Sequence, residues 1–240
     1  MAYRLLRRLP HGVHAVSEQV REHAIRVDGI DPSRVFTVHN GLGLDACHVT
    51  NRPENLGAPV ILTIGNVRHV KGHDLLIRAA ALVVQQVPAA QFQLAGEVLE
   101  TEFFAALQRS IHSLGLEKHF HFLGGVQDLP GLMKQADLFV LPSRSEGFSN
   151  ALIEAMGCGL AVVATDVGGN AEAVQDGVTG IVVPPEDAEA LASAMLRLLG
   201  APEKRLAMGH AGRRRVEIEF SLDAMLRRLT TAYHDILHPG

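Results

Sequence analysis

Two glutamates, Glu146 and Glu154, are separated by seven residues in the segment SRSEGFSNALIEAMGCG at positions 143–159. Glu146 follows an apolar run typical of a buried strand. Glu154 falls about one turn inside a helix whose start is indicated by Ser149, a favoured N-cap residue. The free amides at such a helix start attract phosphate, and carboxylates accept hydrogen bonds from the hydroxyls of a sugar or a ribose. The pattern therefore predicts a site for a phosphorylated sugar, although two acids at these positions are equally typical of a helix cap and a solvated surface.

A second segment, GNVRHVKGHD at positions 65–74, places two cations after another predicted strand. Arg68 and Lys71 precede a helix start, where charge-assisted hydrogen bonds of about 1.5–3 kcal/mol each would hold a diphosphate. The GxxxxGK[ST] spacing of a P-loop is absent. On these residues alone, a solvated loop with two ordinary surface cations explains the segment better.

Short apolar runs alternate with helical patterns along most of the chain. Apolar residues repeat at helical spacing in 75–83, 103–114 and 191–199. The apolar runs between them are VILTIG (60–65), QFQLAG (91–96), HFHFLG (119–124), DLFVLPS (137–143), AVVATD (161–166) and GIVVP (180–184). This alternation predicts an α/β fold, a Rossmann-like parallel sheet with helices on both faces. Ligands bind beyond the carboxyl ends of such strands, so we expect the site in the loops that follow Ile64, Leu94, Leu123, Leu141 and Ala164.

The two ends of the chain show a different pattern. VHAVS at 13–17 and VFTV at 35–38 are strand-like, and the stretch 18–27 between them is helical. Residues 43–58 have weak periodicity and are interpreted as a linker. Near the other end, Ser221 is typical of an N-cap. It precedes an apolar stripe that must pack on another element, made of Leu222, Met225, Leu226, Leu229, Tyr233, Ile236 and Leu237.

Composition excludes several classes of protein. The 240 residues carry 22 Lys+Arg against 26 Asp+Glu, and this net charge of −4 argues against a dedicated nucleic-acid binder. Two cysteines, Cys47 and Cys158, are too few for a disulfide framework and predict a reducing compartment. No apolar run reaches the roughly 18 residues of a membrane span, and the first residues lack a secretion signal. We therefore expect a cytoplasmic protein.

Histidines and arginine clusters suggest two further interpretations, both weaker. Although the chain has 13 histidines, no third ligand accompanies the pairs at 69/73 and 119/121, so no metal site is predicted. The basic triplet at 213–215 and the arginines at positions 4, 7 and 8 are typical of solvated faces. Peripheral contact with anionic lipid at the inner membrane surface is the alternative.

Taken together, these motifs resemble the family 4 glycosyltransferases, retaining enzymes of the GT-B fold, and in particular their C-terminal, donor-binding half. The longest match, SEGFSNALIEAMGCGLAVVATDVGGNAEAV at 145–174, contains the family's spacing of two glutamates separated by seven residues. Further matches are VSEQVREHAI near Val16, HNGL at His39, VKGHDLL at Val70, LPS at Leu141 and DGVTGIVVPP at Asp176. The resemblance covers roughly residues 14–237 and implies two facing Rossmann-like domains with the active site in the cleft between them.

The resemblance also implies residue roles. The catalytic residues would be Glu146, which contacts the hydroxyls of the donor sugar, and Lys71 with Arg68, which neutralise the leaving diphosphate. Glu154 would bind the nucleotide ribose. The other substrate-binding positions would be Gly65 at the end of the first strand, Val126 beside the base, and Gly147, Phe148, Ser149 and Asn150, whose backbone amides would meet the sugar and the diphosphate. Phe148 is equally interpreted as a residue that packs beneath the loop.

The implied reaction would retain anomeric configuration and need no cofactor and no divalent metal. Fixed cations and helix-end dipoles would take the departing charge, and no DxD triplet occurs in the sequence. Two departures from the family pattern stand close to these residues. Asn66 occupies the place of an arginine, and the glycine-rich turn after the second strand is reduced to Gly96-Glu97.

The length of the chain is the largest departure, because a full enzyme would have a further N-terminal domain with the acceptor site. We expect residues 1–50 to be the end of that domain plus a linker, and 51–220 to be the nucleotide-sugar-binding domain. Residues 221–240 would be a helix that crosses back to the missing domain, so its apolar stripe would lack a partner. Such a fragment would bind a nucleotide sugar weakly and transfer little.

The expected function is transfer of a sugar from a nucleotide-sugar donor, such as a UDP-sugar, to an unknown acceptor in polysaccharide or glycoconjugate biosynthesis. Its partners would be the donor, the acceptor and the missing acceptor domain, with no nucleic acid. The alternatives are a non-catalytic sugar-nucleotide-binding module and a sugar-nucleotide epimerase of the same architecture. A dinucleotide oxidoreductase is disfavoured because no G-x-G-x-x-G follows the first strand.

Overall fold

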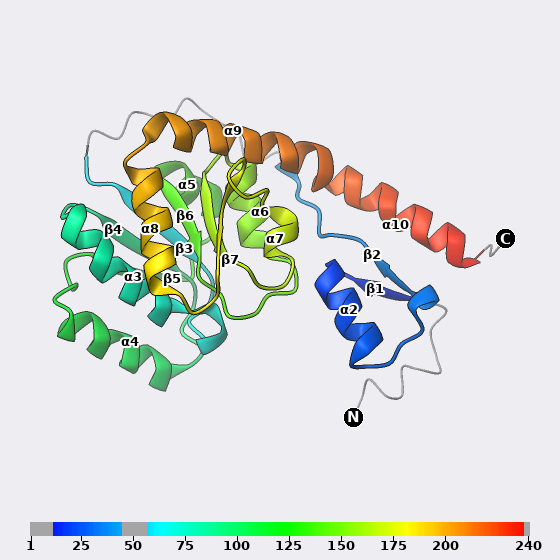
Figure 1. Cartoon of the computed structure of the whole chain (residues 1–240), viewed down its shortest axis with the longest axis horizontal. Helices are drawn as coiled ribbons and strands as arrows, with labels where there is room; N and C mark the ends of the chain where they lie inside the picture. Colours follow the sequence, from blue (N-terminus) through cyan, green and yellow to red (C-terminus); the bar gives the residue numbers. More distant parts are fainter. Residues whose placement is uncertain (1–11, 45–56, 238–240) are drawn as a thin grey trace.

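The computed structural model describes residues 12–44 and 57–237. A small N-terminal unit contains β1 (Val13–Ala15), α2 (Glu18–Arg26), the short helix η1 (Pro32–Arg34) and β2 (Val35–Thr37). The larger unit contains β3 (Val60–Ile64), η3 (His69–Lys71), α3 (His73–Gln86), β4 (Gln91–Ala95), α4 (Thr101–Ser113), β5 (Phe120–Gly124), α5 (Leu129–Gln135), β6 (Leu138–Leu141), α6 (Asn150–Gly157), β7 (Val162–Thr165), α7 (Asn170–Ala173), β8 (Gly180–Val183), α8 (Ala188–Leu199) and α9 (Pro202–Glu219). The helix α10 (Leu222–Leu237) follows (Figure 1).

The large sheet is parallel throughout and has the strand order β5-β4-β3-β6-β7-β8. The chain winds outward from β3 to one edge, returns to β6 beside β3, and then winds to the other edge. This reversal leaves a crevice beyond the carboxyl ends of β3 and β6, which is where open α/β sheets bind their ligands. The predicted Rossmann-like sheet is confirmed.

Strand residues alternate between two apolar layers, as the two-residue period of a strand requires. Ile61 faces the layer built with α3, α4 and α8, whereas its neighbour Leu62 faces the layer built with α5, α6 and α7. Helix α9 crosses both, because Met208 belongs to the first layer and Val216 to the second. Burial on both faces holds the sheet rigid and positions the loops at its carboxyl end.

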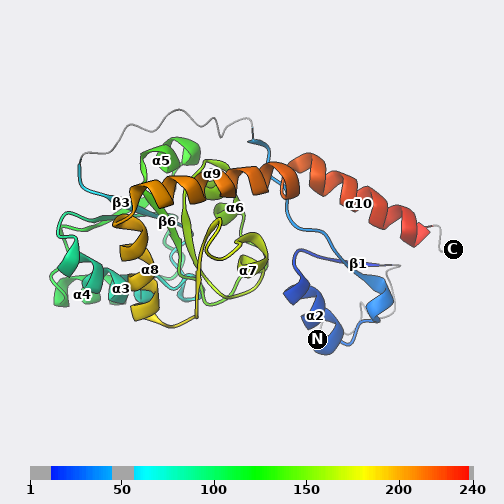
Figure 2. The ribbon, with the colours of Figure 1, turned by 45° about the horizontal axis from the view of Figure 1, so that its top comes forward.

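The small unit is a parallel βαβ unit with a minor core of its own. Its strands pair in register from Val13 with Val35 to Ala15 with Thr37, and Ala24 of α2 packs beneath them. Ser17 caps α2 by accepting a hydrogen bond from the Val20 amide. The small unit and α10 extend from the same side of the large unit (Figure 2).

Helix α10 has a partner along part of its apolar stripe, which corrects one expectation. Tyr233 contacts the ring of Phe36 edge-on at 6.2 Å between centroids, and Met225 packs against Gly41. Leu226 and Leu237 remain exposed. The stripe is partly covered because residues 13–37 fold into a unit rather than forming a loose chain end. The division of the chain at residues 50 and 220 stays a prediction, since the predicted linker falls mostly on positions 45–56, outside the described residues.

Candidate functional site

Two of the predicted catalytic residues meet beyond the carboxyl ends of β3 and β6. The Lys71 ammonium donates to the Glu146 carboxylate with Nζ and Oε1 2.7 Å apart, and the Ser143 hydroxyl donates to the same oxygen at 2.6 Å. The side chain of Glu146 is only 9% exposed and that of Lys71 is 26% exposed. The stem of Lys71 crosses Gly65, where a Cβ atom would lie 3.5 Å from it. A cation and an acid are thus fixed side by side at the crevice.

The loops that carry this pair interlock through their backbones. Gly72 begins α3 with a φ of +66°, and a Cβ atom there would lie 2.0 Å from the carbonyl oxygen of Pro142. The Arg144 amide donates to the carbonyl of Val70 at 2.8 Å. Only a glycine at position 72 allows this approach, so the contact holds Lys71 and Glu146 at a constant separation.

Arg144, which the sequence analysis did not single out, reinforces the same junction with its side chain. Its guanidinium group donates to both carboxylate oxygens of Asp74, at 2.7 and 2.8 Å, and to the carbonyl of His69 at 2.8 Å. Glu186 provides a further carboxylate, whose Oε1 lies 2.5 Å from the Arg144 Nε. Burial acts to raise the pKa of Asp74, but the hydrogen bonds and charge of Arg144 outweigh burial and hold that pKa below its usual value. The bonds to Asp74 raise the pKa of Arg144 in turn.

The loop from Gly147 to Asn150 leads into α6, as predicted. Ser149 is the N-cap, and its hydroxyl accepts a hydrogen bond from the Leu152 amide at 3.4 Å. Phe148 is only 6% exposed and packs against the rings of His39 and Phe220, at 4.8 and 5.2 Å between centroids. Of the two interpretations of this ring, packing beneath the loop is the one that the contacts support.

Glu154 lies one helical turn inside α6, beside a cavity of about 200 Å³. Burial raises the pKa of its carboxyl above the usual value. The other lining residues are Leu42, Gly43, Gln127, Leu129, Pro130 and Met133. Val126, the position predicted beside the base, is half-buried and directly precedes Gln127 in this lining.

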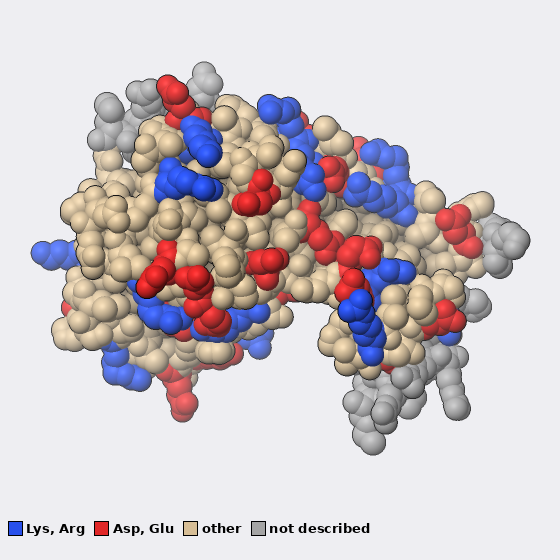
Figure 3. Space-filling model, viewed as in Figure 1, with Lys and Arg blue, Asp and Glu red and all other residues tan. Residues whose placement is uncertain are grey.

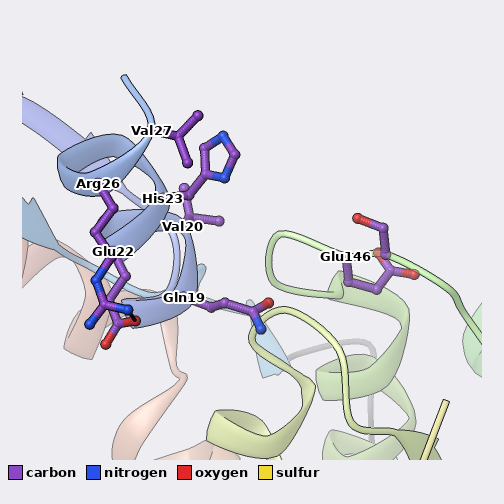
Figure 4. Close-up of a pocket in the computed structure, with 8 residues that line it drawn as sticks. Gln19, Val20, Glu22, His23, Arg26, Val27 and Glu146 are labelled. Carbon is purple, nitrogen blue, oxygen red and sulfur yellow. Dashed lines mark ion pairs between the residues drawn. The ribbon is translucent and has the colours of Figure 1, made fainter. Parts of the chain in front are cut away.

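Glu146 lines a different and larger cavity, of about 450 Å³, whose opposite wall is α2. Figure 4 shows Gln19 and His23 of α2 on one side of this cavity and Glu146 on the other. The space-filling view shows the corresponding hollow between the small and large units, with acidic and basic side chains interspersed over the face seen there (Figure 3). The two glutamates therefore line separate hollows along the loop and helix that join them.

Arg68 lies near an acid of the loop after β4, and its predicted role with the diphosphate stays a prediction. It is 54% exposed, and its Nε lies 3.5 Å from the Glu100 carboxylate. Asn66, which replaces the arginine of the family pattern, accepts a hydrogen bond from the Glu97 amide at 3.0 Å. The loops after β3 and β4 are joined there, and Gly96 approaches so closely that a Cβ atom would lie 2.2 Å from the Gly65 carbonyl oxygen.

No group of three or more histidine, cysteine or acidic side chains is arranged to hold a metal ion in residues 12–44 and 57–237. Within the same ranges no helix is long and apolar enough to cross a membrane.

A family model and several curated proteins are similar to this chain. The family model described as "Glycosyl transferases group 1" matches residues 49–215. A D-inositol 3-phosphate glycosyltransferase from Catenulispora acidiphila is 33% identical over 210 residues, which cover 81% of this chain and 49% of that protein. The lipopolysaccharide core biosynthesis mannosyltransferase LpcC from Rhizobium leguminosarum bv. viciae is 33% identical over 183 residues, covering 75% and 52%. The chain spans about half the length of the curated relatives it matches.

Solved structures agree with this description. Anabaena Alr3699/HepE in complex with UDP-glucose matches with a TM-score of 0.90 and 25% identity, covering 98% of this chain and 66% of that one. The C-terminal domain of the group 1 glycosyl transferase LpcC from Francisella tularensis matches with a TM-score of 0.70 and 25% identity. That match covers 76% of this chain and all of that domain.

Proposed function

The chain belongs to the group 1 glycosyl transferases, and we propose that it binds a nucleotide sugar at the carboxyl ends of β3 and β6 and serves the transfer of that sugar to an acceptor. The single observation that carries the proposal is the Lys71–Glu146 pair, set at the crevice where the strand order reverses. A cation there meets the charge that appears on the diphosphate as the sugar leaves. The adjacent carboxylate accepts hydrogen bonds from sugar hydroxyls.

The site must stabilise the negative charge that develops on the leaving diphosphate in the transition state. In our proposal the Lys71 ammonium and the first amides of α6 neutralise it together, since both belong to loops fixed before ligand arrives. Glu146, held beside Lys71, orients the sugar. We also propose that the reaction retains anomeric configuration, as the family resemblance implies. It would need no divalent metal, because a fixed cation and helix-end amides would take the departing charge.

The nucleotide end of the donor is assigned to the cavity of about 200 Å³ beside Glu154. Glu154 would accept hydrogen bonds from the ribose hydroxyls, and its position one turn inside α6 separates it from the diphosphate by the length of that turn. Arg68 keeps a proposed role with the diphosphate only if it exchanges Glu100 for the ligand, because Glu100 is its partner here.

The relatives suggest which donors to test. Anabaena HepE was solved with UDP-glucose, and a Mycolicibacterium smegmatis relative, 37% identical over 166 residues, is named as GDP-mannose-dependent. We therefore propose a UDP-hexose or GDP-mannose as the donor and a polysaccharide or glycoconjugate precursor as the acceptor.

Calorimetric titration of the chain with UDP, UDP-glucose, GDP and GDP-mannose tests the proposal. One nucleotide and its sugar are expected to bind. Glu154→Gln should lower the affinity for the nucleoside diphosphate by about tenfold, because it removes a charge-assisted hydrogen bond. It should leave the affinity for the matching sugar 1-phosphate unchanged. The proposal is wrong if none of the four ligands binds at millimolar concentration.

A non-catalytic binding module, which would use the same donor site, is the second candidate. Both candidate functions predict the same ligand affinities, and they differ in whether the bound sugar is transferred. Release of UDP or GDP from a bound donor, measured with and without a mixture of sugar and lipid acceptors, separates them.

A further inference from the structure

The carboxylate of Glu172, on the short helix α7, contacts the start of α2 in the small unit. It accepts hydrogen bonds from the backbone amides of Glu18 and Gln19, at 3.0 and 3.2 Å. These amides belong to the first turn of α2, where no carbonyl of the helix itself can accept from them. The next amide is satisfied by the Ser17 cap. Glu172 therefore supplies the acceptors that the beginning of α2 lacks, and its negative charge faces the positive end of the helix dipole.

A third donor reaches the same carboxylate from the segment that leaves the small unit. The Nε2 atom of His39 lies 2.7 Å from Glu172 Oε2. The side chains of His39 and Glu172 are 22% and 24% exposed, so water competes little for this contact. Glu172 thus contacts both the start of α2 and the segment that follows β2.

The turn that leads into α7 is fixed to the loop that carries Glu146. Gly168 has a φ of +55°, and a Cβ atom there would lie 1.9 Å from the Glu146 carbonyl oxygen. The next residue, Gly169, donates its amide to the Gly147 carbonyl at 2.8 Å. Any displacement of α7 therefore moves the backbone that directly follows the Glu146 side chain.

The small unit also rests directly on this loop. A Cβ atom at Gly147 would lie 3.2 Å from Val16, so the loop backbone packs against the residue before the α2 cap. The Asn40 side-chain amide donates to the Phe148 carbonyl at 3.3 Å and to the Asn150 side chain at 2.9 Å. These three contacts join the small unit and the segment that follows it to residues 147–150.

We propose that Glu172 is a positioning residue that seats α2 on the Glu146 loop, so that the small unit forms the outer wall of the donor sugar's subsite. The cavity of about 450 Å³ between α2 and Glu146 is the space that this seating encloses (Figure 4). The inference rests on the proposed nucleotide-sugar site. It assigns the sugar end to a hollow shared by both units and leaves the nucleotide end, beside Glu154, to the large unit.

Two variants and a control test the role of Glu172. Glu172→Gln keeps the shape of the side chain and removes its charge, and Glu172→Ala removes all three contacts. Glu189→Ala, at an exposed acid in the first turn of α8, is the matched control. The unaltered chain and the three variants are compared in two measurements, hydrogen exchange resolved by residue and calorimetric affinity for UDP-glucose against UDP and GDP-mannose against GDP.

The amides of Glu18 and Gln19 should exchange about tenfold faster or more in Glu172→Ala than in the control, with Glu172→Gln between them. In Glu172→Ala the affinity for the nucleotide sugar should fall about tenfold more than the affinity for the nucleotide alone. This corresponds to about 1.4 kcal/mol in the difference between the two binding free energies. A merely structural role of Glu172 would lower the affinities for the nucleotide sugar and for the nucleotide equally. Since Glu172→Gln is isosteric, it keeps the test decisive if Glu172→Ala fails to fold.

The outcomes separate this inference from the proposed function. If the unaltered chain binds neither nucleotide, the donor site itself is wrong and the inference falls with it. If the chain binds nucleotide sugar but Glu172→Gln keeps the control's affinity ratio and exchange rates, the donor site stands and the positioning role is refuted.

Discussion

Removal of the Lys71 ammonium is the sharpest test of the donor site. In the free chain this cation already donates to Glu146 at 2.7 Å, and Glu146 is 9% exposed. Lys71→Ala removes a charge-assisted hydrogen bond to the diphosphate, worth about 1.5–3 kcal/mol, or roughly tenfold to a hundredfold in affinity. It also leaves an uncompensated carboxylate beside the incoming phosphates, so the loss should lie toward the upper end of that range. Calorimetry with UDP and GDP measures it.

Two further variants separate the contributions of the pair. Lys134→Ala, at an exposed cation in the last turn of α5, is the matched control and should leave affinity unchanged. Glu146→Gln frees the ammonium from its partner, so it should keep or improve affinity for the nucleoside diphosphate while weakening the nucleotide sugar. Combined with Lys71→Ala, it should restore part of the lost affinity because the repelling charge is gone. Equal affinities of Lys71→Ala and Lys134→Ala for the bound nucleotide would refute the reasoning.

Three other predictions concern stability. Glu154→Gln should raise the melting temperature at pH 7, because burial raises the pKa of this carboxyl and makes its charged form unfavourable in the folded chain. The gain should disappear below about pH 4, where the acid is protonated in both states, and a gain that persists there contradicts the reasoning. Arg144→Ala should cost roughly 1–3 kcal/mol in urea unfolding at pH 7. Because the pKa of Asp74 is lowered in the folded chain, that cost should shrink as the pH falls through this folded-state pKa, and a cost independent of pH would oppose the assignment. Gly168→Ala and Gly177→Ala both place a Cβ atom at positive φ, for about 1–2 kcal/mol, but only the first meets backbone, 1.9 Å from the carbonyl oxygen of Glu146. Gly168→Ala should therefore unfold more easily than Gly177→Ala and lose nucleotide-sugar binding, and equal melting temperatures would count against the close contact.

The sheet could be predicted from the sequence because each of its strands is a short apolar run that ends in a turn residue. Helix α9 illustrates the limit of that approach. Its buried positions include Gly209 and Gly212, and a Cβ atom at Gly209 would lie 2.0 Å from the carbonyl oxygen of Gly159. A helix that packs through glycines shows no apolar stripe, so hydrophobic periodicity does not predict it.

The site was predictable where its residues follow strands and less so where side chains choose partners across the fold. Lys71 and Glu146 both follow strands, and the βαβ pattern places the carboxyl ends of those strands at one edge of the sheet. The two residues meet because these strands, β3 and β6, are neighbours, which the structure shows. Arg68 pairs with Glu100, and Arg144 with Asp74, through distances that only tertiary structure sets. Glu172 is more distant still, since its partners in α2 precede it by about 150 residues.

The Glu146 loop is supported from three directions, and this has a consequence for affinity. Arg144 ties it to the start of α3, Gly168 ties it to the turn after β7, and Val16 of the small unit packs on Gly147. A carboxylate held in place before ligand arrives loses little conformational freedom on binding, so more of its interaction energy appears as affinity and orientation. Substitutions at the supports should therefore weaken nucleotide-sugar binding although none of them touches the ligand. Because the supports come from separate parts of the chain, their effects should exceed additivity only where two of them hold the same stretch of backbone, as Gly168 and Val16 do at residues 146 and 147.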